Sequence, residues 1–188
     1  MSIEPDRGSY LKVMASMGLG VSDPLRPPYN EEWTKRGEDI TPHISKLISP
    51  AERQVFITTG HPNLDLFGQP QVTGAMREAL GRGAEVTLLF GNKSLGSVGD
   101  ATALVRNSAK GLADLKQDYP DTLHLLWNLR PIRLDVVVVD GAHVINADPE
   151  VTFADQLGVV ITKGDQKWGE HWVKKFSLAI MRSTEINP

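Results

Sequence analysis

Short apolar runs alternate with longer stretches of helical periodicity from residue 52 onward. The short runs predict strands, and the longer stretches predict amphipathic helices. In the last of these, Trp168, Trp172, Phe176 and Ile180 step by four along one face. The predicted strands cover residues 53–58, 85–90, 122–127, 134–139, 142–146 and 156–162, and the predicted helices cover 69–82, 100–117 and 165–181. This alternation predicts an α/β fold, in which a mixed β-sheet is flanked by helices on both faces.

The first 50 residues differ from the rest in composition, because proline and glycine occur in them repeatedly. Only short helices fit between these interruptions, and we place them at residues 10–17 and 40–48. We therefore expect residues 1–50 to form an irregular N-terminal arm and residues 51–188 to form one domain. Tyr29 and Trp33 are expected to anchor the arm on the core or on a partner subunit, since aromatic side chains bury a large area.

Composition excludes several classes of function. The chain has no cysteine, so disulfides, thiolate catalysis and cysteine metal sites are excluded. Its net charge is -3, which offers no overall attraction to nucleic acid or to an anionic membrane. The N-terminus lacks the pattern of a signal peptide, and no run approaches the roughly 20 apolar residues of a membrane span. We expect a cytoplasmic protein that binds neither membranes nor nucleic acid and carries no cofactor.

The segment from Arg133 to Glu150 carries the most information about function. It reads Arg-Leu-Asp, four valines, Asp-Gly, and then the short predicted strand 142–146. It resembles the catalytic strand and hairpin of the phospholipase D-like superfamily, which read His-x-Lys, four mostly apolar residues, Asp-Gly, a second strand and a Gly-Ser-x-Asn turn. Asp140 and Gly141 match that pattern, whereas Arg133 stands at the position of the His and Asp135 at that of the Lys.

The turn after the second strand departs from the superfamily pattern as well, with Ala147, Asp148 and Glu150 at the Gly, Ser and Asn places. The resemblance nevertheless extends over roughly residues 50–183. Residues 76–90 are similar to the superfamily's first helix, Arg-Gly turn and second strand, and residues 156–163 look like its closing strand. The resemblance therefore implies a phospholipase D-like fold whose catalytic positions have changed.

The changed positions do not support the chemistry of the enzymes that the segment resembles, in which the His attacks phosphorus while the Lys neutralises the phosphoryl oxygens. Arg133 is no nucleophile, because its guanidinium stays protonated. A carboxylate at Asp135 repels the anion that a lysine would bind. Arg133 and Asp135 project to the same face of a strand and can pair. Such a pair either fills the former active site as an ion pair or contributes to a binding pocket.

Other polar residues are candidates for the same pocket. Asp148 and Glu150 either solubilise a turn or converge with Asp135 as an oxygen-rich site for a hard cation or a sugar hydroxyl. His61 and Asn63 follow the first predicted strand and either form the rim of the pocket or belong to an ordinary turn. No pair of histidines has a convincing metal-binding spacing.

Three functions remain open on this interpretation. The first is a non-catalytic phospholipase D-like module that binds a small polar ligand, and the second is a scaffolding dimer without a ligand. The alternative is a phosphodiesterase or nuclease that uses a non-standard histidine, for which His61 and His143 are the candidates. Enzymes of this type often build their site from two copies of the motif, so the resemblance implies a homodimer for a chain with one copy.

Overall fold

The computed structural model describes residues 31–33, 39–60, 64–91, 95–130, 132, 135–146 and 160–188. Its strands are β1 (Glu31–Trp33), β2 (Gln54–Gly60), β3 (Glu85–Gly91), β4 (Leu123–Asn128), β5 (Val136–Val139), β6 (His143–Asn146), β7 (Val160–Thr162) and β8 (Thr184–Glu185). Its helices are α2 (Thr41–Ile48), α3 (Leu64–Phe67), α4 (Pro70–Gly81), α5 (Val98–Ser108), α6 (Lys110–Asp118) and α7 (Gln166–Met181). None of these helices has the length and apolar character needed to cross a membrane.

The strands of the described residues form one eight-stranded mixed sheet in the order β1-β7-β6-β5-β2-β3-β4-β8. The three central strands β2, β3 and β4 are parallel, and β5 runs antiparallel to β2. The carboxyl ends of the parallel strands therefore share one edge of the sheet with the amino end of β5. This edge is called the carboxyl edge below, and the opposite one the amino edge.

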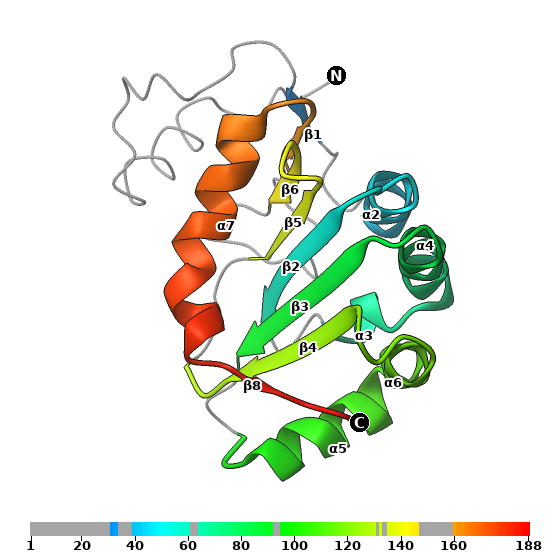
Figure 1. The fold of residues 1–188 in the computed structure, drawn as a ribbon, viewed down its shortest axis with the longest axis vertical. Coiled ribbons are helices and arrows are strands. Elements are labelled where there is room, and N and C mark those ends of the chain that lie inside the picture. The colour runs from blue at the N-terminus through cyan, green and yellow to red at the C-terminus, as the bar shows by residue number, and fades with distance from the viewer. Residues whose placement is uncertain are drawn as a thin grey trace, which may run out of the picture.

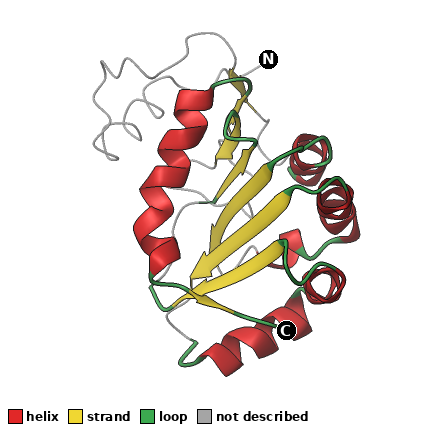
Figure 2. Cartoon of the chain, viewed as in Figure 1, coloured by secondary structure: helices red, strands yellow, loops and turns green. Residues whose placement is uncertain are grey.

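Helices cover both faces of the sheet (Figures 1 and 2), which confirms the fold class predicted from the sequence. The larger of two hydrophobic clusters lies between the sheet and the helices α2, α4, α5 and α6. It includes Ile40, Ile44 and Ile48, so residues around α2 belong to the core. The smaller cluster lies under α7, where Trp172 and Phe176 meet apolar residues of β2, β3, β5 and β6. Successive side chains of a strand point to opposite faces of the sheet, so the strands contribute residues to both clusters.

The single helix predicted over residues 100–117 is wrong, because the structure has two helices there that meet at Ala109. Ala109 leaves helical geometry, with φ -134° and ψ 51°. A Cβ atom built on Gly68 would lie 2.7 Å from the Cα of Ala109, so the two backbones are in direct contact. This long-range contact explains the break. The sequence around Ala109 contains no proline and therefore gives no sign of it.

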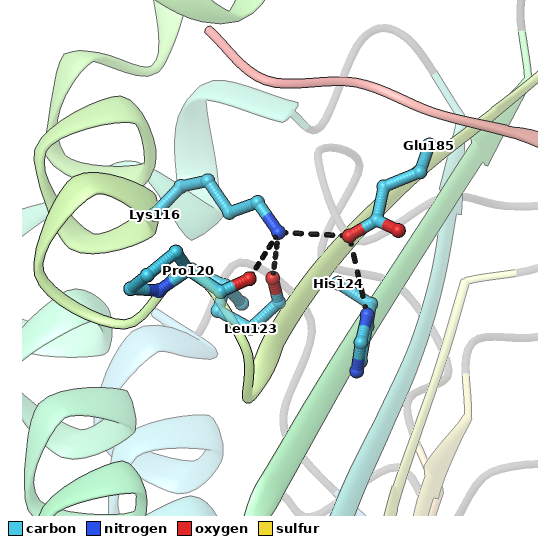
Figure 3. Close-up of polar contacts among 5 residues, drawn as sticks. All are labelled: Lys116, Pro120, Leu123, His124 and Glu185. Atoms are coloured by element: carbon cyan, nitrogen blue, oxygen red, sulfur yellow. Dashed lines mark hydrogen bonds and ion pairs between the residues drawn. The ribbon is translucent and has the colours of Figure 1, made fainter.

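The C-terminal strand β8 is fixed to the sheet by a buried lysine (Figure 3). The Nζ of Lys116, a side chain only 5% exposed, donates hydrogen bonds to the carbonyl oxygens of Pro120 (2.8 Å) and Leu123 (2.6 Å) and to Oε1 of Glu185 (2.8 Å). The Nδ1 of His124 lies 3.2 Å from the same carboxylate oxygen. The hydrogen bond from Lys116 is the main reason that the pKa of Glu185 is lowered. Ionised Glu185 thereby connects β8 with α6 and β4.

Candidate functional site

The carboxyl edge is the candidate site, because ligands of open α/β sheets bind outside the carboxyl ends of the strands. Gly60 of β2, Gly91 of β3 and Asn128 of β4 are the last residues of the parallel strands and lie in register with one another. The first residue of β5, Val136, pairs with Thr58 two residues before the end of β2. Asp135 therefore reaches this edge from the other direction.

Asp135 is the predicted site residue that the structure describes in most detail. Its side chain is 3% exposed, and its Oδ1 accepts a hydrogen bond of 3.0 Å from the backbone N–H of Gly60. This backbone hydrogen bond satisfies part of the hydrogen-bonding capacity of the buried carboxylate. A carboxylate offers no positive charge to a ligand. The side chain of Asp135 thus connects the end of β2 with the start of β5.

Five of the predicted site residues, Arg133, Asp148, Glu150, His61 and Asn63, lie outside the described residues. The expected pairing of Arg133 with Asp135 and the expected pocket rim therefore stay predictions. Tyr29 lies outside as well, as do the side chain of Trp33 and most of the N-terminal arm.

His143, a candidate for the nucleophile, is described and lies at the amino edge. It is the first residue of β6 and pairs with Val139, the last residue of β5. Its Nδ1 accepts a hydrogen bond of 3.2 Å from the backbone N–H of Gly164. His143 and Asp135 therefore flank β5 at opposite ends, so His143 does not contribute to the carboxyl edge.

The segment that leads from β4 to Asp135 is held by two residues that the sequence analysis did not identify. A Cβ atom on Gly91 would lie only 2.2 Å from the carbonyl oxygen of Arg130, so this segment crosses directly over the end of β3. Asn128 fixes it, because its Oδ1 accepts from the N–H of Arg130 (2.8 Å) and its Nδ2 donates to the carbonyl oxygen of Ala179 in α7 (2.9 Å). An asparagine that ends an apolar strand is the signal that could have identified it.

Asn146, the last residue of β6, adds an unexpected polar group to the carboxyl edge. It is 3% exposed and pairs with Val136 on one side and with Val160 on the other. Its Oδ1 has no hydrogen-bond partner within the described part of the chain, and neither has Oγ1 of Thr162, which is 1% exposed. Because Thr162 pairs with Val144, both side chains lie on the face that α7 covers. Buried polar atoms of this kind cost roughly 1–3 kcal/mol each unless a ligand or water satisfies them.

The Asp-Gly pair of the motif lies at the amino edge and has a structural role. Asp140 and Gly141 have φ of 52° and 70°, as a tight hairpin turn requires. The Asp140 carboxylate accepts hydrogen bonds from the backbone N–H groups of Glu52 (3.0 Å), Arg53 (2.8 Å) and Gln54 (3.0 Å). Burial opposes ionisation, but the three N–H groups and the Arg53 guanidinium outweigh it, so the pKa of Asp140 is lowered. The hairpin is thereby fixed to the start of β2.

No metal centre is evident among the described side chains. No group of three or more histidine, aspartate or glutamate side chains within the described ranges is arranged to hold a metal ion. The expected convergence of Asp135 with Asp148 and Glu150 is outside this test, because the last two residues lie beyond the described part.

Comparisons with known proteins give matches among solved structures. No protein-family model and no curated protein matches the chain. TrmBL2, an archaeal chromatin protein with a novel mode of DNA binding, has a TM-score of 0.60 at 12% identity, over 96% of this chain and 61% of that chain. The chain thus spans less than two thirds of the TrmBL2 chain.

Two further matches have names that refer to phospholipids. Nuc from Salmonella typhimurium, a phospholipase D family member, has a TM-score of 0.59 at 12% identity, over 84% of this chain and 97% of that chain. Phosphatidylserine synthase from Haemophilus influenzae has a TM-score of 0.56 at 14% identity, over 84% of this chain and 39% of that chain. Similarity at such low identity concerns the fold alone, and it shows that this chain has a phospholipase D-like fold.

Proposed function

We propose that this chain is a non-catalytic phospholipase D-like domain that acts as a small-molecule binding or scaffolding module. The observation that carries the proposal is Asp135, a buried carboxylate at the position where the motif has a lysine. A carboxylate repels a phosphoryl group that the lysine would neutralise. Its hydrogen bond to the N–H of Gly60 gives Asp135 a structural task between β5 and β2, which a residue awaiting a substrate does not need.

A buried polar atom at this edge supports a small polar ligand. Oδ1 of Asn146, the last residue of β6, is a hydrogen-bond acceptor. A neutral ligand with a hydroxyl group matches this atom better than an anion does. The fold itself permits a binding function as well as a catalytic one, since it occurs in an archaeal chromatin protein and in phospholipase D family members.

The alternative, a phosphodiesterase or nuclease with a non-standard histidine, loses one of its two candidates. His143 lies at the amino edge, so His61 is the candidate that is left for the nucleophile. His61 itself lies outside the described residues. The homodimer stays a prediction, which a monomer mass in sedimentation equilibrium would contradict.

Crystals soaked in tungstate, a phosphate analogue with a strong anomalous signal, test the proposal at the site itself. We expect no tungstate within hydrogen-bond distance of Asp135, because an anion would meet the negative charge of a carboxylate there. An Asp135→Asn variant removes the charge and keeps an oxygen for the N–H of Gly60, so it provides the matched control. An anomalous peak that bridges Arg133 and Asp135 in the unmodified protein would refute the proposal.

A further inference from the structure

A cavity of about 310 Å³ lies on the face of the sheet that α7 covers. We call it the β4 pocket. It is lined by Gln54, Val55, Phe56, Glu85, Thr87, His124, Leu126, Val173 and Ile180. Its volume is within the range of small-molecule sites. Gln54 and Glu85 are the first residues of β2 and β3, and His124 is the second of β4. The β4 pocket therefore belongs to the amino edge and is separate from the carboxyl edge around Asp135.

The apolar walls of the β4 pocket belong to the core packing under α7. Phe56 is a member of the smaller hydrophobic cluster, and Leu126, Val173 and Ile180 pack against that cluster. Trp172, which is fully buried in the same cluster, holds α7 on the sheet. The fold thus sets the position of the walls, so a ligand would enter a surface that is already formed.

The structure fixes the hydrogen-bonding state of His124 in this pocket. Its Nδ1 lies 3.2 Å from Oε1 of Glu185. The same oxygen accepts a hydrogen bond of 2.8 Å from Nζ of Lys116, which is the main reason that the pKa of Glu185 is lowered. An ionised carboxylate only accepts hydrogen bonds, so Nδ1 of His124 has to carry the proton.

The other ring nitrogen of His124, Nε2, is then a hydrogen-bond acceptor in the neutral ring. Figure 3 shows it at the end of the ring that points away from Glu185. Thr87, which pairs directly with His124 in the neighbouring strand, lines the same pocket. Within the described part of the chain, the polar contact of the His124 side chain is the one with Glu185, so Nε2 is available to a ligand.

Glu85 places a second acceptor group on the same face. It precedes Thr87 by two residues on β3, and side chains two residues apart on a strand point to the same side. Thr87 in turn lies beside His124 on that side. A carboxylate accepts hydrogen bonds from N–H and O–H groups, as Nε2 of His124 does. The two side chains therefore ask the same chemistry of a ligand.

We propose that the β4 pocket binds a small, mostly apolar molecule that carries N–H or O–H groups, with its apolar body against Leu126, Val173 and Ile180 and one donor at Nε2 of His124. Aromatic compounds with a ring N–H or a hydroxyl group have this chemistry. A molecule of the same shape that only accepts hydrogen bonds would cover Nε2 without a donor, which weakens its binding. The proposal does not depend on the function of the carboxyl edge.

Titration of the ¹⁵N-labelled full chain with indole and with benzofuran, followed by NMR chemical shifts, tests this inference. The two probes have nearly the same bicyclic shape, but indole donates an N–H where benzofuran has an acceptor oxygen. We expect indole to bind about fivefold more tightly, which is the effect of one net hydrogen bond. Absence of indole binding, or equal affinity for the two probes, would overturn the proposal.

Two variants attribute the preference for indole to one side chain. His124→Phe keeps an aromatic ring and removes the acceptor, so it is expected to bind both probes with equal affinity. His143→Phe is the matched control, because His143 lies at the start of β6 and does not line the β4 pocket. It is expected to keep the fivefold preference of the unmodified protein, about one net hydrogen bond. A preference that persists in His124→Phe would contradict the proposed contact.

Long-range ¹H–¹⁵N correlations of the imidazole rings test the tautomer directly at about pH 8, above the ordinary pKa of histidine. We expect the proton on Nδ1 of His124 and, as an internal reference, on Nε2 of His143, whose Nδ1 accepts from the N–H of Gly164. Glu185→Gln removes the carboxylate that requires a donor, so both the Nδ1–H tautomer of His124 and the preference for indole are expected to decrease. A proton on Nε2 of His124 in the unmodified protein would refute the proposal.

Discussion

Replacement of Gly169 by alanine is expected to destabilise the protein by about 3 kcal/mol, as overpacking of a fixed contact does. Gly169 lies in the first turns of α7, where a Cβ atom would be 2.2 Å from the carbonyl oxygen of Gly141 and 2.9 Å from the backbone nitrogen of Ala142. Both are backbone atoms of the β5–β6 hairpin and cannot rotate away. The added methyl group therefore has to displace α7 from the hairpin, which would disturb the packing of Trp168 and Trp172.

Gly74→Ala is the matched control, because it adds the same methyl group to another helix. Gly74 lies in the middle of α4, and no neighbouring side chain or strand comes within 4 Å of the place that its Cβ atom would occupy. Alanine is the better helix former, so this variant is expected to stabilise the protein by about 0.5–1 kcal/mol. Urea unfolding measures both free energies. Effects of the same sign in the two variants would show that α7 does not lie on the hairpin as described.

The second large effect is expected for Asp140→Ala, which should reduce the free energy of unfolding by about 2–4 kcal/mol. The variant leaves the N–H groups of Glu52, Arg53 and Gln54 without their carboxylate acceptor. It also places alanine at φ 52°, a conformation that alanine rarely adopts. Asp140→Asn keeps an acceptor oxygen and tolerates this conformation, so its loss should be clearly smaller.

The effect of Asp140→Asn should depend on pH. Because the pKa of Asp140 is lowered in the folded state, its carboxylate stabilises the fold above the ordinary aspartate pKa. That contribution is lost as the pH falls through the folded-state pKa. The difference in unfolding free energy between the unmodified protein and Asp140→Asn should thus be constant near neutral pH and shrink below about pH 4. A difference that persists undiminished at about pH 2 would be inconsistent with an ionised Asp140 in the hairpin.

Local sequence patterns predicted the elements whose apolar periodicity is strong. The last helix, predicted over 165–181, is α7 at Gln166–Met181, because its four aromatic and aliphatic residues face the sheet. The patterns did not predict β1, α3 or β8, which are two to four residues long. Elements of this length carry too few residues for a period. β8 depends on Lys116 and Leu125, more than 50 residues away in sequence.

Helix boundaries that depend on single side chains were predicted less well. The helix predicted over residues 100–117 begins at an aspartate, a residue type that favours helix starts, but the structure starts α5 earlier, at Val98. Ser97 is the cap, and its Oγ accepts from the N–H of Asp100. Both residues satisfy the serine and aspartate preferences for helix starts, so the sequence alone does not choose between them. By contrast, the helix predicted over residues 69–82 ends close to where it was expected, because α4 ends at Gly81 and Gly83 shortly after it has φ 91°, a conformation that favours glycine.

Residues of the candidate site could be predicted from the sequence only where they stand at positions of the motif. The motif placed Asp135 next to β5 and Asp140 at the hairpin. It gave no reason to consider Asn128 or Asn146, which reach the carboxyl edge because β4 and β6 end there. Their roles depend on neighbours distant in sequence, such as Ala179 for Asn128 and Val160 for Asn146. Burial turns these two ordinary asparagines into candidates, and burial follows from the fold.

Hydrolysis of bis-p-nitrophenyl phosphate by the purified protein tests the central claim most directly, namely that the phospholipase D-like frame is kept without its chemistry. The account predicts no turnover above the buffer control, because Arg133 is no nucleophile and Asp135 is a buried carboxylate at the position that the resemblance assigns to a phosphate-binding lysine. Turnover that survives repurification and disappears in a His61→Ala variant would contradict the account and establish a phosphodiesterase with a non-standard histidine.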